Sequence, residues 1–425
     1  MGIRTRLIIM NFLQFAIWGA YLTSMGSYLV SSGLGSHIGV FYAMQGFVSI
    51  FMPPLMGIIA DKWLQAQKVY GLCHLLSGLF MISAGYYGMT SLGHTSYPVL
   101  LSLYSLSIAF YMPSLSLSYS VAYNALEKAG KDTISAFPPI RIFGTIGFII
   151  TMVAVDYLGF QATPSQFFVS SILSLILAFY SLTLPKCETH KNMERKSVID
   201  VLGLRAFTLF KDKTMAIFFI FSMLLGVALQ ITNGYANPFI TSFKAVEQYA
   251  QSFGANHANA LISLSQCSET LCILLIPFFL KRFGIKKVML ISMIAWVLRF
   301  GLFGLGNPGS GVWMFILSMI VYGVAFDFFN VSGSLFVNKA VDKQMRSSAQ
   351  GLFILMTNGI GATFGTLIAQ FIVNHFTYSQ DFQGATYTVG DWSSAWYIFA
   401  GYALAVAILF AMLFHYKGDI EKRNV

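Results

Sequence analysis

The sequence is poor in charged residues, and this scarcity decides the class of protein. Asp, Glu, Lys and Arg make up 10% of the 425 residues, whereas an ordinary soluble domain contains about 25%. Hydrophobic residues reach 56% and aromatic residues 16%. This composition excludes a soluble globular domain, a disordered chain and a nucleic-acid-binding protein. The chain needs lipid as its solvent, and we expect an integral membrane protein that binds no nucleic acid.

Several chemical signatures are also missing. The four cysteines have the spacing of neither a disulfide framework nor a zinc site. No G-x4-G-K-[ST] loop for ATP is present, nor the pattern of a metal site or an activated nucleophile. We therefore expect no enzyme, no metal and no cofactor, so that active transport would draw on an ion gradient.

Long apolar stretches fill most of the chain. A helix needs roughly 20 apolar residues to cross a bilayer. The runs are long and do not alternate, which favours helices over barrel strands. We predict an all-α membrane protein with twelve transmembrane helices, near residues 7–30, 37–60, 68–90, 97–125, 139–159, 165–185, 214–238, 259–280, 287–306, 311–338, 347–374 and 393–416.

The basic residues indicate the orientation of these helices. If both termini are cytoplasmic, all but three of the 26 Lys and Arg residues fall on the cytoplasmic side, which leaves 26 − 3 = 23 there. The exceptions are Lys244 outside, and Arg141 and Arg299 within apolar stretches. Cytoplasmic loops are enriched in Lys and Arg, so we predict that both termini are cytoplasmic.

A polar, basic link divides the chain into halves. Residues 186–213 begin with a charged run and continue in an amphipathic pattern typical of a helix on the inner membrane surface. We predict an N-terminal six-helix bundle over residues 1–185, a cytoplasmic linker over 186–213 and a C-terminal six-helix bundle over 214–425.

Two loops occupy corresponding places in these halves. Gly57-Ile-Ile-Ala-Asp61-Lys62 ends the second apolar stretch, and Lys281-Arg282-Phe-Gly284-Ile-Lys-Lys ends the eighth. Both resemble the G-x3-D-[RK]-x-G-x-[RK]-[RK] loop of the major facilitator superfamily. The resemblance implies two bundles that rock about a central site. Asp61, Lys62, Arg282 and Gly284 would then stabilise one conformation at the cytoplasmic helix ends.

Polar side chains inside the apolar stretches are the candidates for function. A charge at membrane depth costs roughly 2.5–3.5 kcal/mol on insertion. Glu269 is expected near the midplane, and Asp327 near the middle of its helix. A carboxylate there can carry a proton while the cavity alternates, and the competing role is a permanently ionised partner of Arg141. For Arg299, structural ion pairing is the favoured interpretation.

Helical spacing gathers other polar and aromatic residues on shared faces. Amides and carboxylates can hydrogen-bond hydroxyls and heterocycle edges, and aromatic rings can stack on a flat ring. These sets favour a neutral, polar, partly aromatic solute, and the alternative for each is a hydrogen bond between helices. The sets are Arg141 with Thr145 and Phe148, Gln230 with Asn233, Gln266 with Glu269, and Tyr322 with Phe326 beside Asp327.

Longer polar stretches carry a closer resemblance. Residues 137–148, 215–233, 265–271, 322–330 and 348–351 resemble the nucleoside:proton symporter family, and the similarity covers essentially the whole chain. It implies proton-driven nucleoside import across the bacterial cytoplasmic membrane, and we expect a monomer. A sugar or oligosaccharide proton symporter is the alternative, followed by a nutrient receptor that does not transport. The resemblance places around the nucleoside Arg141, Thr145, Phe148, Gln230, Asn233, Gln266, Glu269, Tyr322, Phe326 and Asp327, with Glu269 and Asp327 as proton carriers.

Overall fold

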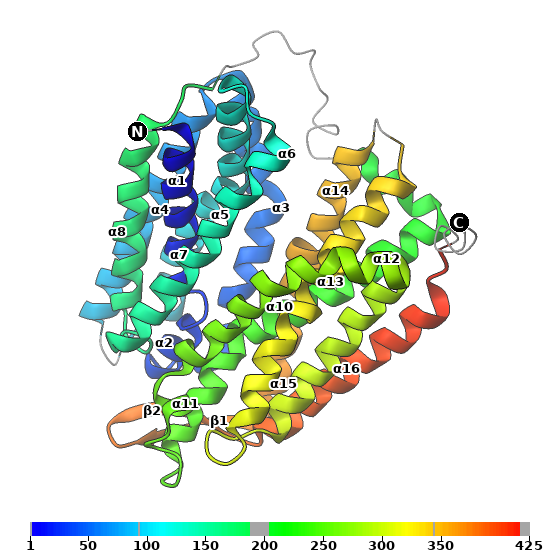
Figure 1. Ribbon diagram of the computed structural model, residues 1–425. Helices are drawn as coiled ribbons and strands as arrows, with labels where there is room; N and C mark the ends of the chain where they lie inside the picture. The colour runs from blue at the N-terminus through cyan, green and yellow to red at the C-terminus, as the bar shows by residue number, and fades with distance from the viewer. Residues whose placement is uncertain (1, 92–93, 188–203, 343–344, 417–425) are drawn as a thin grey trace. The chain divides into compact units, whose positions relative to one another are not determined.

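The computed structural model describes residues 2–91, 94–187, 204–342 and 345–416. The regular structure of these residues is helical, apart from one β-hairpin. The chain divides into two compact units, residues 1–197 with 381–386 and residues 198–380 with 387–425 (Figure 1).

The described residues of the first unit form six longer helices and several short ones. The short elements are α2 (Met25–Ser31), α6 (Thr133–Ala136), η1 (Gly35–His37) and η2 (Ser181–Thr183). The longer ones are α1 (Ile3–Gly19), α3 (Ile38–Lys62), α4 (Ala66–Thr90), α5 (Tyr97–Lys128), α7 (Pro138–Tyr157) and α8 (Ser165–Tyr180).

The prediction of one continuous helix over residues 7–30 is wrong. A turn separates α1 from α2 between Gly19 and Met25. A break in a helix frees backbone carbonyls that must find other donors. The Tyr42 hydroxyl donates a hydrogen bond to the Leu22 carbonyl inside this turn, so the break is stabilised by a side chain of α3.

Glycines let α1 and α7 approach closely. A Cβ atom at Gly19 would lie 2.4 Å from the carbonyl oxygen of Phe148, and one at Gly147 would lie 2.3 Å from that of Phe12. Small residues at such crossings are typical of helices packed in a membrane. The contact fixes α7, which carries three of the predicted site residues, along α1.

The first described element of the second unit is η3 (Leu204–Lys211). The hairpin of β1 (Thr377–Phe382) and β2 (Ala385–Gly390) precedes its last helix. The other elements are α10 (Lys213–Ser242), η4 (Phe243–Ala245), α11 (Phe253–Asn256), α12 (Ala258–Leu305), α13 (Val312–Ala340), α14 (Arg346–Ile354), the π-helix η5 (Leu355–Gly361), α15 (Ala362–Phe376) and α16 (Trp392–Leu413).

α12 covers two of the predicted membrane helices. It contains 48 residues, about 72 Å of helix at 1.5 Å per residue. Gly284 interrupts it with φ 78° and ψ 170°, a backbone conformation that glycine adopts without steric cost. The segments before and after Gly284 correspond to predicted spans 259–280 and 287–306.

α10 packs tightly against the π-helix η5. A Cβ atom on Gly226 would lie 2.0 Å from the Thr357 carbonyl oxygen, and one on Gly361 would lie 2.3 Å from that of Met223. Short π-helical turns inside α-helices often occur at functional sites. The sequence predicted one regular helix over residues 347–374, and the structure divides it into α14, η5 and α15.

Ten helices in the described part of the chain are long and apolar enough to cross a membrane. α1 is not among the ten, because its 17 residues are just below the roughly 20 of a typical span. α12 is counted as one of the ten, although it covers two predicted spans. The prediction of an apolar, helical membrane protein is confirmed. The number of crossings and the side on which the termini lie stay predictions.

The hairpin follows from its turn residues. Gln383 and Gly384 both have positive φ, 51° and 80°, as a two-residue type I′ turn requires. Thr386 donates a hydrogen bond to the Asp381 carboxylate at 2.6 Å across the hairpin. The sequence did not predict these strands between the last two membrane helices.

The predicted amphipathic helix of the linker lies mostly outside the described residues, since 188–203 are not among them. The described part, η3, is a 3₁₀ helix rather than an α-helix. Its Phe207 and Phe210 rings stack with centroids 5.9 Å apart, and Phe210 contacts Phe219 of α10 at 5.5 Å. A location on the membrane surface stays a prediction.

Candidate functional site

In the first unit, the guanidinium of Arg141 is held by two aromatic side chains. Its Cζ atom lies 3.8 Å from the centroid of the Phe15 ring on α1. Its Nε donates a hydrogen bond to the Tyr119 hydroxyl of α5 at 3.0 Å. A ring face stabilises a cation, and both contacts fix the direction of a long, flexible side chain. Arg141 remains half-buried.

The other predicted site residues of this unit extend along α7 from Arg141. Thr145 is half-buried, and Phe148 is buried at 7% exposure where α7 meets α1. Their i, i+4, i+7 spacing places them on one helix face. This face can therefore offer a cation, a hydroxyl and an aromatic ring in sequence.

A hydrogen-bonded hub lies deeper in the same bundle. The Gln14 side-chain carbonyl accepts from the Tyr70 hydroxyl at 2.7 Å and lies 2.9 Å from His74 Nε2. Its amide nitrogen donates to Ser114 Oγ at 2.9 Å. The hub joins α1, α4 and α5, so Gln14 links three helices. His74 is a buried core residue of this hub.

In the second unit, Gln230 and Asn233 form a pair on α10. The Asn233 side chain donates to the Gln230 amide oxygen at 3.2 Å, so the predicted i, i+3 pair does share a face. Gln230 is buried and Asn233 half-buried. An amide pair of this kind leaves donor and acceptor positions for a polar solute.

The remaining predicted residues gather around Tyr322 where α12 packs against α13. The Tyr322 ring stacks on Phe326 with centroids 5.8 Å apart and planes at 6°. Its hydroxyl hydrogen-bonds the Gln266 side chain, and the carboxylates of Glu269 and Asp327 are among its charged neighbours. The structure therefore brings together, within one unit, two stacked rings, an amide and both predicted proton carriers.

Close helix contact maintains this cluster. A Cβ atom at Gly323 would lie 2.6 Å from the Ser268 backbone. The Ser268 hydroxyl donates to the Ile320 carbonyl, and the Ser292 hydroxyl to the Ala325 carbonyl. Glycine and serine at these positions let the two helices meet with their polar groups satisfied.

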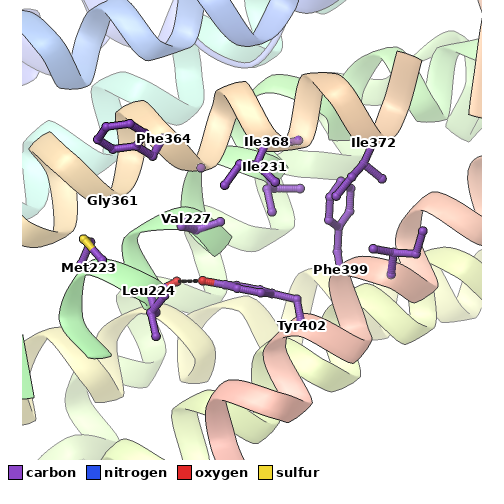
Figure 2. A pocket seen from close by; sticks show the side chains of 13 residues that line it. Met223, Leu224, Val227, Ile231, Gly361, Phe364, Ile368, Ile372, Phe399 and Tyr402 are labelled. Atoms are coloured by element: carbon purple, nitrogen blue, oxygen red, sulfur yellow. Dashed lines mark hydrogen bonds between the residues drawn. The ribbon is translucent and has the colours of Figure 1, made fainter. Parts of the chain in front are cut away.

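Two cavities of the second unit differ in their relation to the cluster. A small one of ≈ 20 Å³ is lined by Phe326, Asn330 and Trp296, among others, and has room for about one water molecule. A larger one of ≈ 280 Å³ lies between α10, α15 and α16 (Figure 2). Its one hydroxyl, that of Tyr402, is engaged by the Leu224 carbonyl at 2.7 Å. This apolar lining contains none of the predicted site residues and does not suit a polar solute.

The predicted conformational loops are described only in part. The side chains of Asp61 and Lys62 lie outside the described part of the structure, although α3 ends at Lys62. In the second loop, Gly284 supplies the kink of α12, and the Arg282 guanidinium lies 5.8 Å from the Phe283 ring. Their role in a conformational change stays a prediction.

Comparison with known proteins decides the family. The family model described as nucleoside H+ symporter matches residues 1–419. The chain belongs to this family. It is an integral protein of the bacterial inner membrane and a transporter rather than an enzyme.

The similar proteins support this assignment at full length. The chain is 45% identical to the xanthosine permease of Escherichia coli over 426 residues, covering 99% of this chain and 98% of that protein. It is 46% identical to the nucleoside permease NupG of the same organism over 421 residues, with 98% and 97% covered. The crystal structure of NupG matches with a TM-score of 0.87 at 45% identity, covering 98% of this chain and all of that chain.

Sugar transporters share the fold at a greater distance. A D-xylose–proton symporter structure matches with a TM-score of 0.67 at 13% identity, covering 97% of this chain and 98% of that chain. The maltose permease of Geobacillus stearothermophilus is 22% identical over 375 residues, 86% of each chain. The comparisons thus favour the nucleoside family over the sugar transporters that were the alternative.

Two contacts of the site were not anticipated from the sequence. Phe15 and Tyr119 hold Arg141, but both are ordinary aromatic residues in apolar stretches. Only the i, i+1 position of Phe15 beside the polar Gln14 could have drawn attention to it. Arg299 was expected to form an ion pair, yet it contacts neutral groups: serine oxygens and two aromatic rings.

Proposed function

We propose that this chain imports nucleosides together with protons through alternating access of two bundles. Membership in the family and the full-length similarity to two nucleoside permeases support this function. The observation that carries it is the Tyr322 cluster, where stacked rings lie beside an amide and two carboxylates. Such a group can stack on a base and hydrogen-bond its edge or the ribose.

The substrate would contact the side chains that were predicted from the sequence. In this proposal Gln230, Asn233 and Gln266 bind ribose hydroxyls and base. Phe148, Tyr322 and Phe326 pack on the rings. The polar and cationic groups that complete the site are Arg141, Thr145, Glu269 and Asp327.

The proton gradient would supply the energy, with no cofactor. Glu269 is half-buried and Asp327 is buried, so the uncharged, protonated form of each is the one best suited to a membrane interior. One charge moving through 100 mV is worth about 2.3 kcal/mol, roughly fiftyfold in concentration ratio. Protonation outside and release inside would couple this energy to uptake.

The proposed topology has twelve crossings with both termini in the cytoplasm. α1 together with α2, and the two segments of α12, supply the crossings beyond the other nine long helices. Residues 1–185 and 214–425 form the two bundles, and 186–213 link them in the cytoplasm. The loops with Asp61, Lys62, Arg282 and Gly284 would stabilise one conformation, and the transporter would work as a monomer.

Uptake by reconstituted protein tests the function. Proteoliposomes with an imposed inward proton gradient should accumulate uridine, xanthosine or another nucleoside in a panel. Unlabelled nucleosides should compete and maltose, sucrose and xylose should not. Accumulation of a sugar with no nucleoside transported would assign the alternative. Saturable nucleoside binding without counterflow would indicate a receptor, and either result would contradict the proposal.

A further inference from the structure

Arg299 is a buried cation that the transport cycle above leaves without a role. Its side chain, on α12, is 2% exposed. Nη1 donates to the Ser318 carbonyl at 2.8 Å and to Ser265 Oγ at 3.3 Å. The Ser318 hydroxyl donates back to the Arg299 carbonyl at 3.0 Å. The guanidinium is therefore fixed between α12 and α13 by groups that carry no charge.

Two aromatic rings cover the same guanidinium. Its Cζ atom lies 4.5 Å from the Tyr322 ring centroid and 5.1 Å from that of Phe303. Ring faces stabilise a desolvated cation, but by far less than the cost of burying an isolated charge. Nε has no hydrogen-bond partner among the described residues. These contacts hold the positive charge in place without neutralising it.

Tyr322 connects this charge to the proposed proton carriers. Arg299 lies over its ring at 4.5 Å, and the carboxylates of Glu269 and Asp327 are its other charged neighbours. In a low-dielectric interior, charges interact over longer distances than in water. A fixed cation here therefore favours the ionised form of the nearby carboxylates.

We propose that Arg299 is a positioning residue for proton coupling: it orients Tyr322 and allows Glu269 and Asp327 to release their proton inside the membrane. This inference rests on the proposed function. A carboxylate in an apolar bundle binds a proton readily, but it can complete a transport cycle only if the ionised form is also accessible. The Arg299 charge stabilises this ionised form, so that the carboxylate can release its proton.

The groups along this contact define the pH response. α12 contributes Glu269, Cys272 and Arg299, and α13 contributes Tyr322 and Asp327. α10 meets α12 through an uncharged pair, since Asn237 donates to Asn259 at 2.7 Å. From α16, the Trp396 indole stacks on Phe300 with centroids 5.9 Å apart, and the phenol of Tyr397 lies at Gly304.

Reconstituted full-length protein with Arg299→Gln and Arg299→Lys tests the proposal. The readouts are uridine counterflow as a function of pH, and accumulation under an imposed proton gradient. For Arg299→Gln, the pH at which counterflow falls to half should rise by about 1 unit, as expected for loss of a neighbouring opposite charge. Accumulation should fall at least tenfold while counterflow at low pH is retained. Arg299→Lys keeps the charge, so the pH at which its counterflow falls to half (the half-point) should equal that of the parent.

Met319→Leu is the matched packing control. The Met319 sulfur lies 3.9 Å from Arg299 Nη1, and the residue is fully buried, so this change alters the surroundings of the guanidinium without changing charge. Its half-point should equal that of the parent. An Arg299→Gln half-point that also equals the parent's would overturn the proposal.

A folding defect would also give an answer. If Arg299→Gln no longer purifies as a monodisperse protein, adding Asp327→Asn together with Glu269→Gln should restore it, because neither carboxylate would then remain uncompensated. Failure of these added changes to restore folding would mean that Arg299 serves packing, and would reject the proposal. The parent protein distinguishes failure of this inference from failure of the proposed function. If the parent transports no nucleoside and shows no pH-dependent counterflow, the proposed function itself is wrong.

Discussion

The guanidinium of Arg141 lies over the ring of Phe15, with 3.8 Å between its Cζ atom and the ring centroid. Tyr119 holds the same group from α5 through a 3.0 Å hydrogen bond. Side chains of α1 and α5 therefore fix the orientation of this side chain of α7. The cation that we propose for substrate binding benefits from such pre-organisation, because less rotamer freedom is lost when the substrate arrives.

Phe15→Leu should weaken nucleoside binding through Arg141. Loss of a contact worth about 0.5–2 kcal/mol should raise the KM of uridine uptake about 2- to 30-fold with little change in maximal rate. Uptake kinetics in proteoliposomes would measure it. In an Arg141→Gln background the same change should add almost nothing, because the partner of the ring is gone.

Phe167→Leu is the control for this experiment. Phe167 is a buried ring of the same unit that packs on Tyr21 and Tyr28, away from Arg141. It should cost stability but leave the KM near that of the parent. An equal rise in KM for both variants would mean that Phe15 acts by general packing.

Neutralising the proposed proton carriers should separate exchange from accumulation. Glu269→Gln and Asp327→Asn remove one titratable group each and keep the shape of the side chain. Each variant should lose pH-driven accumulation of uridine, and a variant that still binds substrate should retain counterflow. Scintillation counting of labelled uridine under an imposed proton gradient checks this. Concentrative uptake by both variants would show that neither carboxylate is the carrier.

Local spacing in the sequence predicted those contacts that lie within one helix. Gln230 and Asn233 are three residues apart and do hydrogen-bond, and Tyr322 and Phe326 are four apart and do stack. The apolar stretches also placed most helix boundaries to within a few residues, because bilayer thickness sets helix length.

Contacts between helices could not be predicted in this way. The position of Phe15 under Arg141 depends on the close approach of α1 and α7 at Gly19 and Gly147. That approach is set by packing between residues that are far apart in the sequence. Arg299 was expected beside a carboxylate because charge alone was visible. Its hydrogen-bond acceptors are a backbone carbonyl, a serine hydroxyl and a methionine sulfur, and none of these has a recognisable pattern in a sequence.

The glycines between α10 and η5 should be sensitive to a single methyl group. Gly226→Ala or Gly361→Ala would place Cβ within 2.3 Å or less of a backbone carbonyl oxygen, so the helices must separate. Overpacking of this kind typically costs about 1–3 kcal/mol. Both variants should melt at lower temperature than the parent in detergent, as followed by tryptophan fluorescence or size-exclusion chromatography after heating.

Gly351→Ala provides the comparison within the same unit. Its Cβ would meet nothing within 4 Å, and alanine is about 1 kcal/mol better than glycine inside a helix. This variant should be as stable as the parent or slightly more so. If it is destabilised as strongly as Gly226→Ala, the close approach of α10 and η5 is not the cause.

The N-terminus of α16 should respond to acid through Asp391. This carboxylate accepts from the Ser394 backbone N–H at 3.0 Å and from the Ser394 hydroxyl at 2.5 Å. These hydrogen bonds lower the pKa of Asp391 below its ordinary value. Because the folded-state pKa is depressed, the stabilisation is present above the ordinary Asp pKa of about 3.9 and is lost as the pH falls through the folded-state value.

Hydrogen exchange of the first turn of α16 measures this effect. In the parent, the protection factor of the Ser394 amide should stay unchanged from pH 6 down to the ordinary Asp pKa of about 3.9, and should fall as the pH is lowered further through the folded-state value. Asp391→Asn keeps an oxygen acceptor at the helix start but cannot titrate, so its protection should change little over that range. In Asp391→Ala the Ser394 amide should be poorly protected throughout this pH range. If the parent and Asp391→Asn lose protection in parallel on acidification, the titrating group lies elsewhere and the cap is not the acid-sensitive element.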